Sequence, residues 1–160
     1  MEEKKVEFTY KVLKTEELSA EDTLLMKIVS ESAQLAYAPY SKYSVGAAVV
    51  KDDGSHVRAN NQENAVYPLG ICAERLAIFS CMSQSPNSII RTLGVIAMKD
   101  GNIQSSITPC GACRQVLLET ELNQEEDIRV VLFGRNEAVI IPSAKDLLPL
   151  YFQKTNVVGK

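Results

Sequence analysis

Apolar and polar positions divide the chain into a charged arm and a body with regular periodicity. In residues 1–18, apolar side chains recur at every second position from Val6 to Val12, which is the period of a strand, although so charged a segment is also typical of a solvated arm. At Ser19 the pattern changes, because a serine followed by acidic residues predicts a capped helix start. This helix should end before Pro39, since the residue before a proline is pushed out of the α region.

The remaining body predicts strands that alternate with helices. Strand-like runs lie at residues 43–50, 56–58, 93–98, 128–133 and 139–141, and helical patterns follow Cys72, begin at Pro109 and open at residues 142–146. In the helix after Cys72 we expect Leu76, Ala77 and Phe79 to face inward. Such alternation of strands and helices predicts an α/β sandwich with a mixed sheet.

Composition is that of one ordinary globular domain. The chain has 160 residues, of which 46% are hydrophobic and 23% charged. We expect a single domain over 1–160, with an N-terminal extension at 1–18 and a core at 19–155. The net charge of −3, from 17 basic and 20 acidic residues, does not favour a nucleic-acid partner. No apolar run approaches the ~20 residues that span a bilayer, so no membrane partner is expected. The first residues have no signal-peptide pattern, and a cytoplasmic location is expected.

The nitrogen and sulfur ligands available to a metal are few. The cysteines are Cys72, Cys81, Cys110 and Cys113, and the only histidine is His56. Four cysteines could form two disulfides, but in a chain expected to be cytosolic a metal or a catalytic role is the better interpretation. With a single histidine, a transition metal would be bound mostly by sulfur.

The spacing of three cysteines favours a catalytic metal site. Cys110 and Cys113 are three residues apart, which places both sulfurs on one face of a helix. Cys72 also lies where a loop becomes a helix, and helix N-termini favour thiolates. Three protein ligands leave a coordination position for water, whereas a structural zinc site normally has four. Glu74, two residues after Cys72, could take a proton beside the metal without binding it.

Other interpretations of these residues are weaker. Cys110 and Cys113 could be a redox pair, but Cys72 and Glu74 would then have no role. Cys81 could be a fourth ligand of a structural zinc, but it lies nine residues after Cys72, ~13 Å away along a helix. We expect Cys81 to be a small buried residue. His56, next to a predicted hairpin turn, is expected to be solvated.

Two motifs carry a resemblance to a known family. Cys72-Ala73-Glu74-Arg75 together with Pro109-Cys110-Gly111-Ala112-Cys113 resembles the signature of the zinc deaminases. Further segments at 36–41, 45–48, 63–65, 67–70 and 147–149 are similar to those of the small homotetrameric cytidine deaminases, over roughly residues 24–152. This resemblance implies a three-layer α-β-α sandwich around a five-stranded mixed sheet. It also implies a homotetramer whose active sites are completed by neighbouring subunits.

The resemblance implies a role for each site residue. Cys72, Cys110 and Cys113 would bind one Zn²⁺ per chain, Glu74 would be the proton shuttle, and Arg75 would support the sulfurs. Asn61 and Glu63 would bind the sugar hydroxyls. Further substrate contacts would come from Tyr43, Ala73 and Phe152. Tyr43 stands where the family usually has phenylalanine, on the pocket wall. Phe152 matches an aromatic residue that reaches a neighbouring subunit's base pocket.

The implied reaction is hydrolytic deamination of cytidine and 2′-deoxycytidine to uridine and 2′-deoxyuridine plus ammonia. In it, zinc-bound hydroxide attacks C4 of the base and Glu74 moves the protons. Three thiolates around Zn²⁺ leave a local charge of about −1, which weakens the metal as a Lewis acid. Arg75 adjoins the site and could donate hydrogen bonds to two sulfurs, which would offset that charge.

Three other functions are compatible with parts of the pattern. A deaminase of another aminated heterocycle, such as blasticidin S, would share the metal motif but would not need Asn61 and Glu63 for a ribose. A deaminase of single-stranded nucleic acid would need a basic groove, which the acidic balance does not favour. An inactive, deaminase-like binding protein could lose a ligand or the glutamate, and this chain retains them all.

Overall fold

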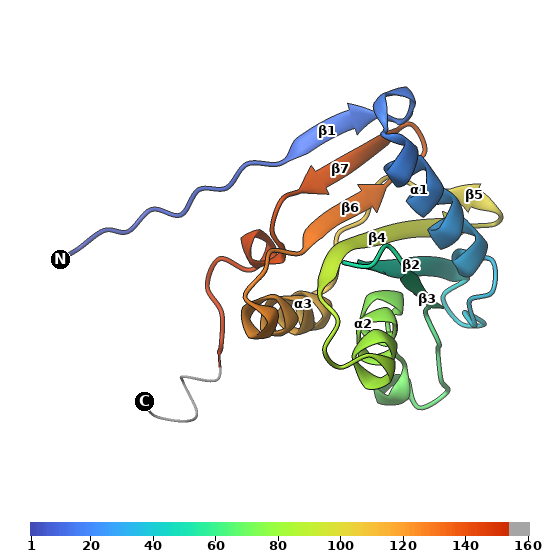
Figure 1. Ribbon diagram of the computed structural model, residues 1–160. Helices are drawn as coiled ribbons and strands as arrows, with labels where there is room; N and C mark the ends of the chain where they lie inside the picture. The colour runs from blue at the N-terminus through green and yellow to red at the C-terminus, as the bar shows by residue number, and fades with distance from the viewer. Residues whose placement is uncertain (154–160) are drawn as a thin grey trace.

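The fold is organised around one mixed β-sheet (Figure 1). The computed structural model describes residues 1–153. Its strands are β1 (Lys11–Lys14), β2 (Tyr43–Lys51), β3 (His56–Asn60), β4 (Ile90–Lys99), β5 (Asn102–Ile103), β6 (Arg129–Phe133) and β7 (Glu137–Ile141). The strand order is β1-β7-β6-β4-β2-β3, and β5 pairs with the end of β4. Only the pairing of β4 with β6 is parallel among the described strands.

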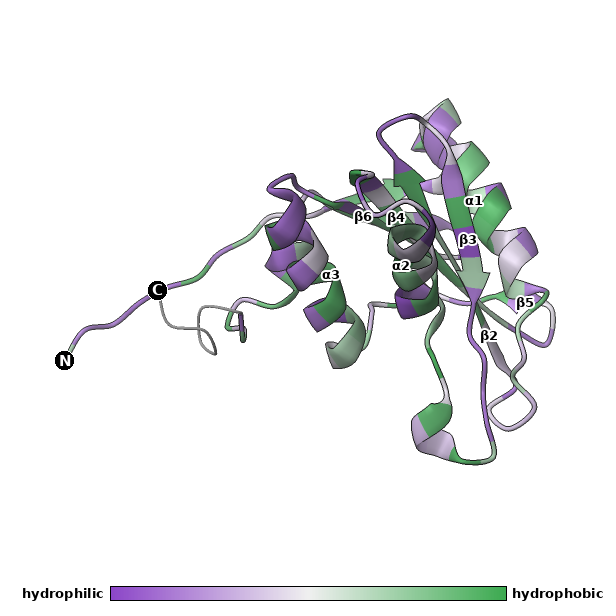
Figure 2. Ribbon diagram, turned by 60° about the horizontal axis from the view of Figure 1, so that its bottom comes forward, coloured by the Kyte–Doolittle hydropathy of each residue, from purple (hydrophilic) through white to green (hydrophobic). Residues whose placement is uncertain are grey.

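The helices cover both faces of this sheet. The α-helices are α1 (Ala20–Ala33), α2 (Ala73–Gln84) and α3 (Gly111–Gln124), and short 3-10 helices span Thr15–Glu17, Tyr67–Leu69 and Ala144–Leu147. Helix α1 lies on one face, while α2 and α3 lie side by side on the other (Figures 1 and 2). This arrangement confirms the predicted three-layer sandwich. Within residues 1–153, every helix is too short or too polar to cross a bilayer.

Each face of the sheet has its own hydrophobic core. The core under α1 contains Leu25, Val29 and Phe133, and the one under α2 and α3 contains residues such as Ile78 and Leu117. These side chains are at most 4% exposed, so both layers exclude water.

Local chemistry explains how α1 is positioned. The Ser19 hydroxyl accepts a hydrogen bond from the Asp22 N–H at 3.0 Å and caps the helix as predicted. The helix ends at Ala33, before Pro39, also as predicted. It approaches β2 so closely at Gly46 that a Cβ there would lie 2.0 Å from the Val29 carbonyl oxygen. Glycine is therefore required at this contact.

The structure differs from the sequence-based expectation in several details. The sheet has seven strands and not five, because β1 and β5 are added to the predicted set. In the arm, the strand covers Lys11–Lys14, and residues 1–10 pair with no other strand. Phe79 is 48% exposed, contrary to prediction, because its neighbour Ile78 occupies the sheet-facing side of α2. The predicted core boundary at 155 lies outside the described residues.

Candidate metal centre and substrate site

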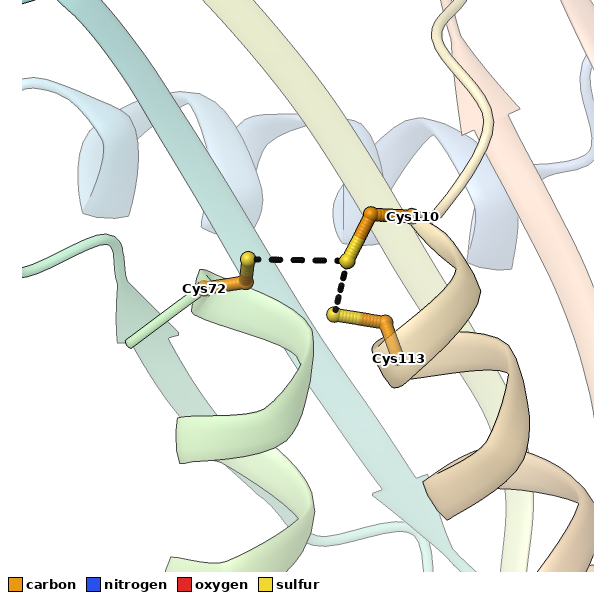
Figure 3. A group of neighbouring side chains, drawn as sticks. All are labelled: Cys72, Cys110 and Cys113. Carbon is orange, nitrogen blue, oxygen red and sulfur yellow. Dashed lines mark hydrogen bonds between the residues drawn. The ribbon is translucent and has the colours of Figure 1, made fainter. Parts of the chain in front are cut away.

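Three cysteines meet where α2 and α3 begin (Figure 3). Cys72 is the N-cap residue of α2, Cys110 is the N-cap residue of α3, and Cys113 lies in the first turn of α3. The Cys72 and Cys110 Sγ atoms are 3.9 Å apart, and those of Cys110 and Cys113 are 3.5 Å apart. All three Sγ atoms lie within 4.8 Å of one another. The sequence prediction that these residues converge is confirmed.

The surroundings of the three sulfurs favour a thiolate. Hydrogen bonds from Cys113 and then Cys110 lower the pKa of Cys72 to about 5, and Arg75 contributes in the same direction. The hydrogen bond to Cys72, together with burial, raises the pKa of Cys113. The two helix N-termini add positive potential. The cluster therefore holds at least one thiolate near neutral pH, which is the form that binds metal.

The geometry and the donor atoms fit zinc. Tetrahedral coordination with Zn–S bonds of about 2.3 Å places sulfurs about 3.8 Å apart, close to the two separations given above. Cys81 is fully buried and is not part of the cluster, which confirms its interpretation as a small core residue. His56 is exposed at the start of β3, as predicted. A three-sulfur set leaves one coordination position open, as in catalytic zinc sites.

Glu74 and Arg75 flank the sulfurs. Glu74 is only 4% exposed in the first turn of α2. Burial raises the pKa of its carboxyl group, and the nearby charge of Cys72 acts in the same direction. Although burial opposes it, the hydrogen bond and charge of Cys72 raise the pKa of Arg75, and the charge of Cys113 adds to this effect. The Arg75 Nε is buried without a hydrogen-bond partner among the described residues, so one donor is left at the site.

Arg114 supports the loop that carries Cys110. Its Nε donates to the Pro109 carbonyl at 2.8 Å, and its two terminal nitrogens donate to the Leu147 carbonyl and the Thr108 hydroxyl. Sequence analysis missed this residue. The sequence offered one indication of its role, which is its position directly after Cys113 near the start of the helix.

Asn61 joins the end of β3 to the start of β2. Its Oδ1 accepts a hydrogen bond from the Val45 N–H at 2.8 Å, and its Nδ2 donates to the Tyr43 carbonyl at 3.0 Å. An amide NH₂ has two N–H bonds, so one donor can still serve a ligand. Asn61 therefore positions Tyr43, a role that sequence analysis did not predict.

Glu63 lies close to the cysteine cluster through backbone pairing. Its Oε2 accepts from the backbone N–H groups of Tyr40 and Ser41, at 2.9 and 3.3 Å. A hydrogen bond from Ser41 lowers the pKa of Glu63, which keeps it ionised. Gln62 and Ile71 exchange backbone hydrogen bonds of 3.0 and 2.9 Å, and Cys72 follows Ile71. This bridge between Gln62 and Ile71, which the sequence did not predict, places the segment from Asn61 to Glu63 alongside the chain that leads into Cys72.

The remaining predicted contacts lie in different environments. Ala73 is fully buried as the first residue of α2, and Tyr43 is half-buried at the start of β2. Phe152 is 61% exposed, and its backbone carbonyl accepts a hydrogen bond from Gln115. Three surface hollows of the described residues, of about 390, 380 and 560 Å³, include none of the three clustered cysteines in their walls.

Comparisons with known proteins identify deaminases as relatives of this chain. The family described as "Cytidine and deoxycytidylate deaminase zinc-binding region" matches residues 19–125. A cytidine deaminase from Halalkalibacterium halodurans is 41% identical over 96 residues, which cover 60% of this chain and 69% of the relative. A blasticidin-S deaminase from Bacillus cereus is 25% identical and covers 89% of this chain and 99% of the relative.

A solved structure shows the same architecture. The crystal structure of cytidine deaminase from Burkholderia pseudomallei aligns with a TM-score of 0.67 and 36% sequence identity. The alignment covers 81% of this chain and 98% of that chain. The matched region begins after the N-terminal arm in the family comparison and contains all three clustered cysteines and Glu74.

Proposed function

The chain belongs to the family of zinc-dependent cytidine and deoxycytidylate deaminases, and from this membership we propose that it hydrolyses the exocyclic amine of cytidine and 2′-deoxycytidine. Water is consumed, the C4–N bond breaks, and the products are uridine or 2′-deoxyuridine and ammonia. The observation that carries this proposal is the cluster of Cys72, Cys110 and Cys113 beside the buried Glu74.

The three cysteines would hold zinc, and Glu74 would move the protons. Zinc bound there supplies a Lewis acid that makes a water molecule nucleophilic at neutral pH. The Glu74 carboxylate accepts one proton from the attacking water and transfers it to N3 of the base. It then takes the remaining proton from the new hydroxyl at C4 and delivers it to the amine, which leaves as ammonia. A buried carboxyl group with a raised pKa suits this exchange, because its two protonation states are closer in energy near neutral pH.

Arg75 would support the metal by drawing charge from the sulfurs. Three thiolates and Zn²⁺ carry a net charge of about −1. The positive charge of Arg75 acts on both Cys72 and Cys113. Hydrogen bonds from a guanidinium to ligand sulfurs reduce the electron density they give to the metal.

Asn61 and Glu63 would select a nucleoside by its sugar hydroxyls. Glu63 uses one carboxylate oxygen for backbone N–H groups, and a carboxylate has further lone pairs to accept from hydroxyls. A negative charge there would repel a 5′- or 3′-phosphate held close to it, which favours nucleosides over nucleotides and polymers. Tyr43 would form part of the pocket wall, and the N-terminus of α2 at Ala73 would contribute a backbone donor.

A homotetramer is part of the same proposal. The side chain of Phe152 is 61% exposed and is available to a neighbouring subunit. This exposure supports a pocket that is completed by a neighbouring copy. Light scattering that gives a monomer under assay conditions would remove the role of Phe152.

The central experiment combines turnover with metal analysis. We expect purified protein to carry one zinc per chain and to convert cytidine, followed by the loss of cytosine absorbance. Glu74→Gln should retain zinc and lose about 10²–10⁴ of the rate. Cys110→Ala should lose zinc and activity, whereas Cys81→Ala should retain both. Near-normal turnover by Glu74→Gln would overturn the role of Glu74.

A substrate panel separates the related chemistries. Cytidine, 2′-deoxycytidine, blasticidin S and a single-stranded oligonucleotide would be compared at equal concentration. We expect cytidine and 2′-deoxycytidine to be converted much faster than blasticidin S and the oligonucleotide. If a zinc-loaded protein preferred blasticidin S, the proposed metal centre would stand, but the proposed substrate would be wrong.

A further inference from the structure

The N-terminal arm has two chemically different sides. Residues 1–10 run as an extended segment away from the body (Figure 1). The rings of Phe8 and Tyr10 contact each other with centroids 6.2 Å apart, and Lys5 forms an ion pair with Glu7. Even-numbered apolar residues therefore share one side and the odd-numbered charges share the other, as an extended backbone requires.

The apolar side is only partly covered. Val6, Phe8, Tyr10 and Val12 are 48–60% exposed. Phe8 and Tyr10 line a hollow of about 380 Å³ together with residues of β7 and the segment after it, such as Ile141 and Leu147. Four apolar side chains in a row on an extended segment are an open docking surface.

The outer edge of β1 is available for pairing. β1 pairs with β7 on one side, and the Thr15 N–H donates to the Asn136 carbonyl beyond it. Backbone N–H and C=O groups alternate in direction along a strand. Those of odd-numbered residues therefore point toward β7, and those of even-numbered residues point toward the open edge. No described strand occupies that edge. The arm thus continues an unpaired sheet edge, which is the feature that accepts an added strand.

The arm is complementary to itself over Val6–Val12 in one antiparallel register, and the pairing ends before Lys4, which would lie opposite Lys14. If two arms pair around a two-fold axis at Thr9, Val6 lies opposite Val12, Phe8 opposite Tyr10, and Glu7 opposite Lys11. The apolar pairs then share one face, and two Glu–Lys pairs share the other. Moving the register by two residues places Lys5 opposite Lys11 in one direction and Val6 opposite Lys14 in the other. Cross-strand pairs of these types contribute about 0.2–1 kcal/mol each, and like charges are unfavourable.

From this complementarity we infer that two copies of the chain pair through their arms, as antiparallel strands over Val6–Val12. The interface is isologous, because each arm presents the same surface to the other. It joins the β1 edges of two sheets and brings the aromatic sides of both arms together on one face. Residues 1–18 contain five acidic and four basic side chains, so the arm has no charge excess that would attract a polyanion or an anionic membrane. This inference does not depend on the deaminase activity or on the tetramer proposed above.

The pairing is expected to be weak, so a covalent trap is the suitable test. The contact lies below the ~1,200 Å² of stable interfaces, because each arm offers only seven residues, of which the four apolar ones are already about half covered. Opposed residues of an antiparallel pair have Cβ atoms about 4.5–5.5 Å apart, which allows a disulfide after a small shift. Thr9→Cys places two thiols on the axis. In Lys5→Cys, the control, the thiols would be more than ~25 Å apart.

The experiment measures disulfide-linked dimer after mild oxidation of zinc-loaded, full-length protein. We expect most Thr9→Cys chains to run as a dimer without reductant, and Lys5→Cys and the unmodified protein to remain single chains. Adding Glu7→Lys to Thr9→Cys should reduce the dimer several-fold, and adding Lys11→Glu as well should restore it. Equal yields from Thr9→Cys and Lys5→Cys, or no effect of the charge reversals, would overturn the pairing. Cytidine turnover, measured in parallel, tests the deaminase activity separately.

Discussion

Arg129 on β6 holds Asp22 on α1 by two parallel hydrogen bonds, although the two residues are 107 positions apart in the sequence. The distances are 2.7 Å from one terminal nitrogen to Oδ1 and 2.8 Å from the other to Oδ2. The Asp22 side chain is 7% exposed. This fork ties the helix that packs on one face of the sheet to a central strand, and it is the kind of charged pair that contributes measurably to stability.

The first prediction concerns acid sensitivity. The hydrogen bonds from Arg129 lower the pKa of Asp22. A carboxyl group whose pKa is lowered by folding stabilises the protein above its unfolded pKa of about 3.9, and this contribution is lost as the pH falls through the folded pKa. We expect Asp22→Asn to lower the free energy of unfolding by about 1.5–3 kcal/mol at pH 7. Urea unfolding of both proteins should show this difference shrinking below about pH 4.

The comparison at each pH removes other acid effects. Loss of zinc at low pH would affect both proteins alike, so only the difference between them is attributed to Asp22. A difference that stays constant from pH 7 to pH 3 would contradict the role of this ionised pair.

A second prediction concerns the buried carboxylate of Glu121. Its Oε2 accepts hydrogen bonds from the backbone N–H groups of Ile128 and Ala144, and its Oε1 accepts from the Ser143 hydroxyl and the Lys145 N–H. In Glu121→Gln, either amide orientation turns an NH₂ toward an N–H donor. We expect a loss of about 1.5–3 kcal/mol in chemical denaturation. Ser143→Ala, which removes one of these bonds, should cost about 1 kcal/mol. Equal losses would show that the carboxylate is not the centre of this network.

Sequence and structure agree best where the signal is local. The convergence of Cys72, Cys110 and Cys113 was predictable, because each motif lies in a short segment at a helix start. The cap of α1 at Ser19 was predictable for the same reason. The family resemblance supplied the three-layer arrangement, which the structure confirms. Its five-stranded sheet lacked β1 and β5. β1 lies in the arm, outside the resemblance, and β5 has only two residues and offers almost no periodicity.

The features that were missed depend on partners far apart in the chain. Gln62 pairs with Ile71 through backbone atoms, which no side-chain pattern reports. Arg114 reaches the Leu147 carbonyl across 33 positions. Phe79 was assigned to the wrong side of α2, because both Ile78 and Phe79 are apolar and only packing against the sheet decides between them.

A third prediction tests the contact between α1 and β2. A Cβ at Gly46 would meet backbone atoms, the Val29 carbonyl oxygen at 2.0 Å and the Ala33 nitrogen at 2.6 Å. At Gly94 the nearest atoms belong to the Leu25 side chain, at 2.7 Å, which can rotate away. We expect Gly46→Ala to lower stability by about 3 kcal/mol or more and Gly94→Ala by about 1 kcal/mol. Thermal unfolding of the two variants would check this order, and the reverse order would contradict the close backbone approach.

The last prediction separates two roles of Asn61. Its amide bonds Val45 and Tyr43, so its loss should loosen the pocket wall whatever the sugar carries. Glu63→Gln should keep an acceptor for the backbone N–H groups of Tyr40 and Ser41. It should lose only the proposed charged contact to a sugar hydroxyl. With cytidine, we expect both Asn61→Ala and Glu63→Gln to lower kcat/KM by about tenfold or more, the scale of one charged or buried hydrogen bond.

With 3′-deoxycytidine the two variants should diverge. The loss of kcat/KM in Glu63→Gln should nearly vanish, because the hydroxyl that we propose as the partner of Glu63 is absent. The loss of kcat/KM in Asn61→Ala should persist in large part, because Tyr43 is still displaced. This is a double-mutant cycle in which the substrate supplies one of the two changes. If the Asn61→Ala penalty also vanished, Asn61 would act on the sugar alone, and its bonds to β2 would have no influence on the pocket.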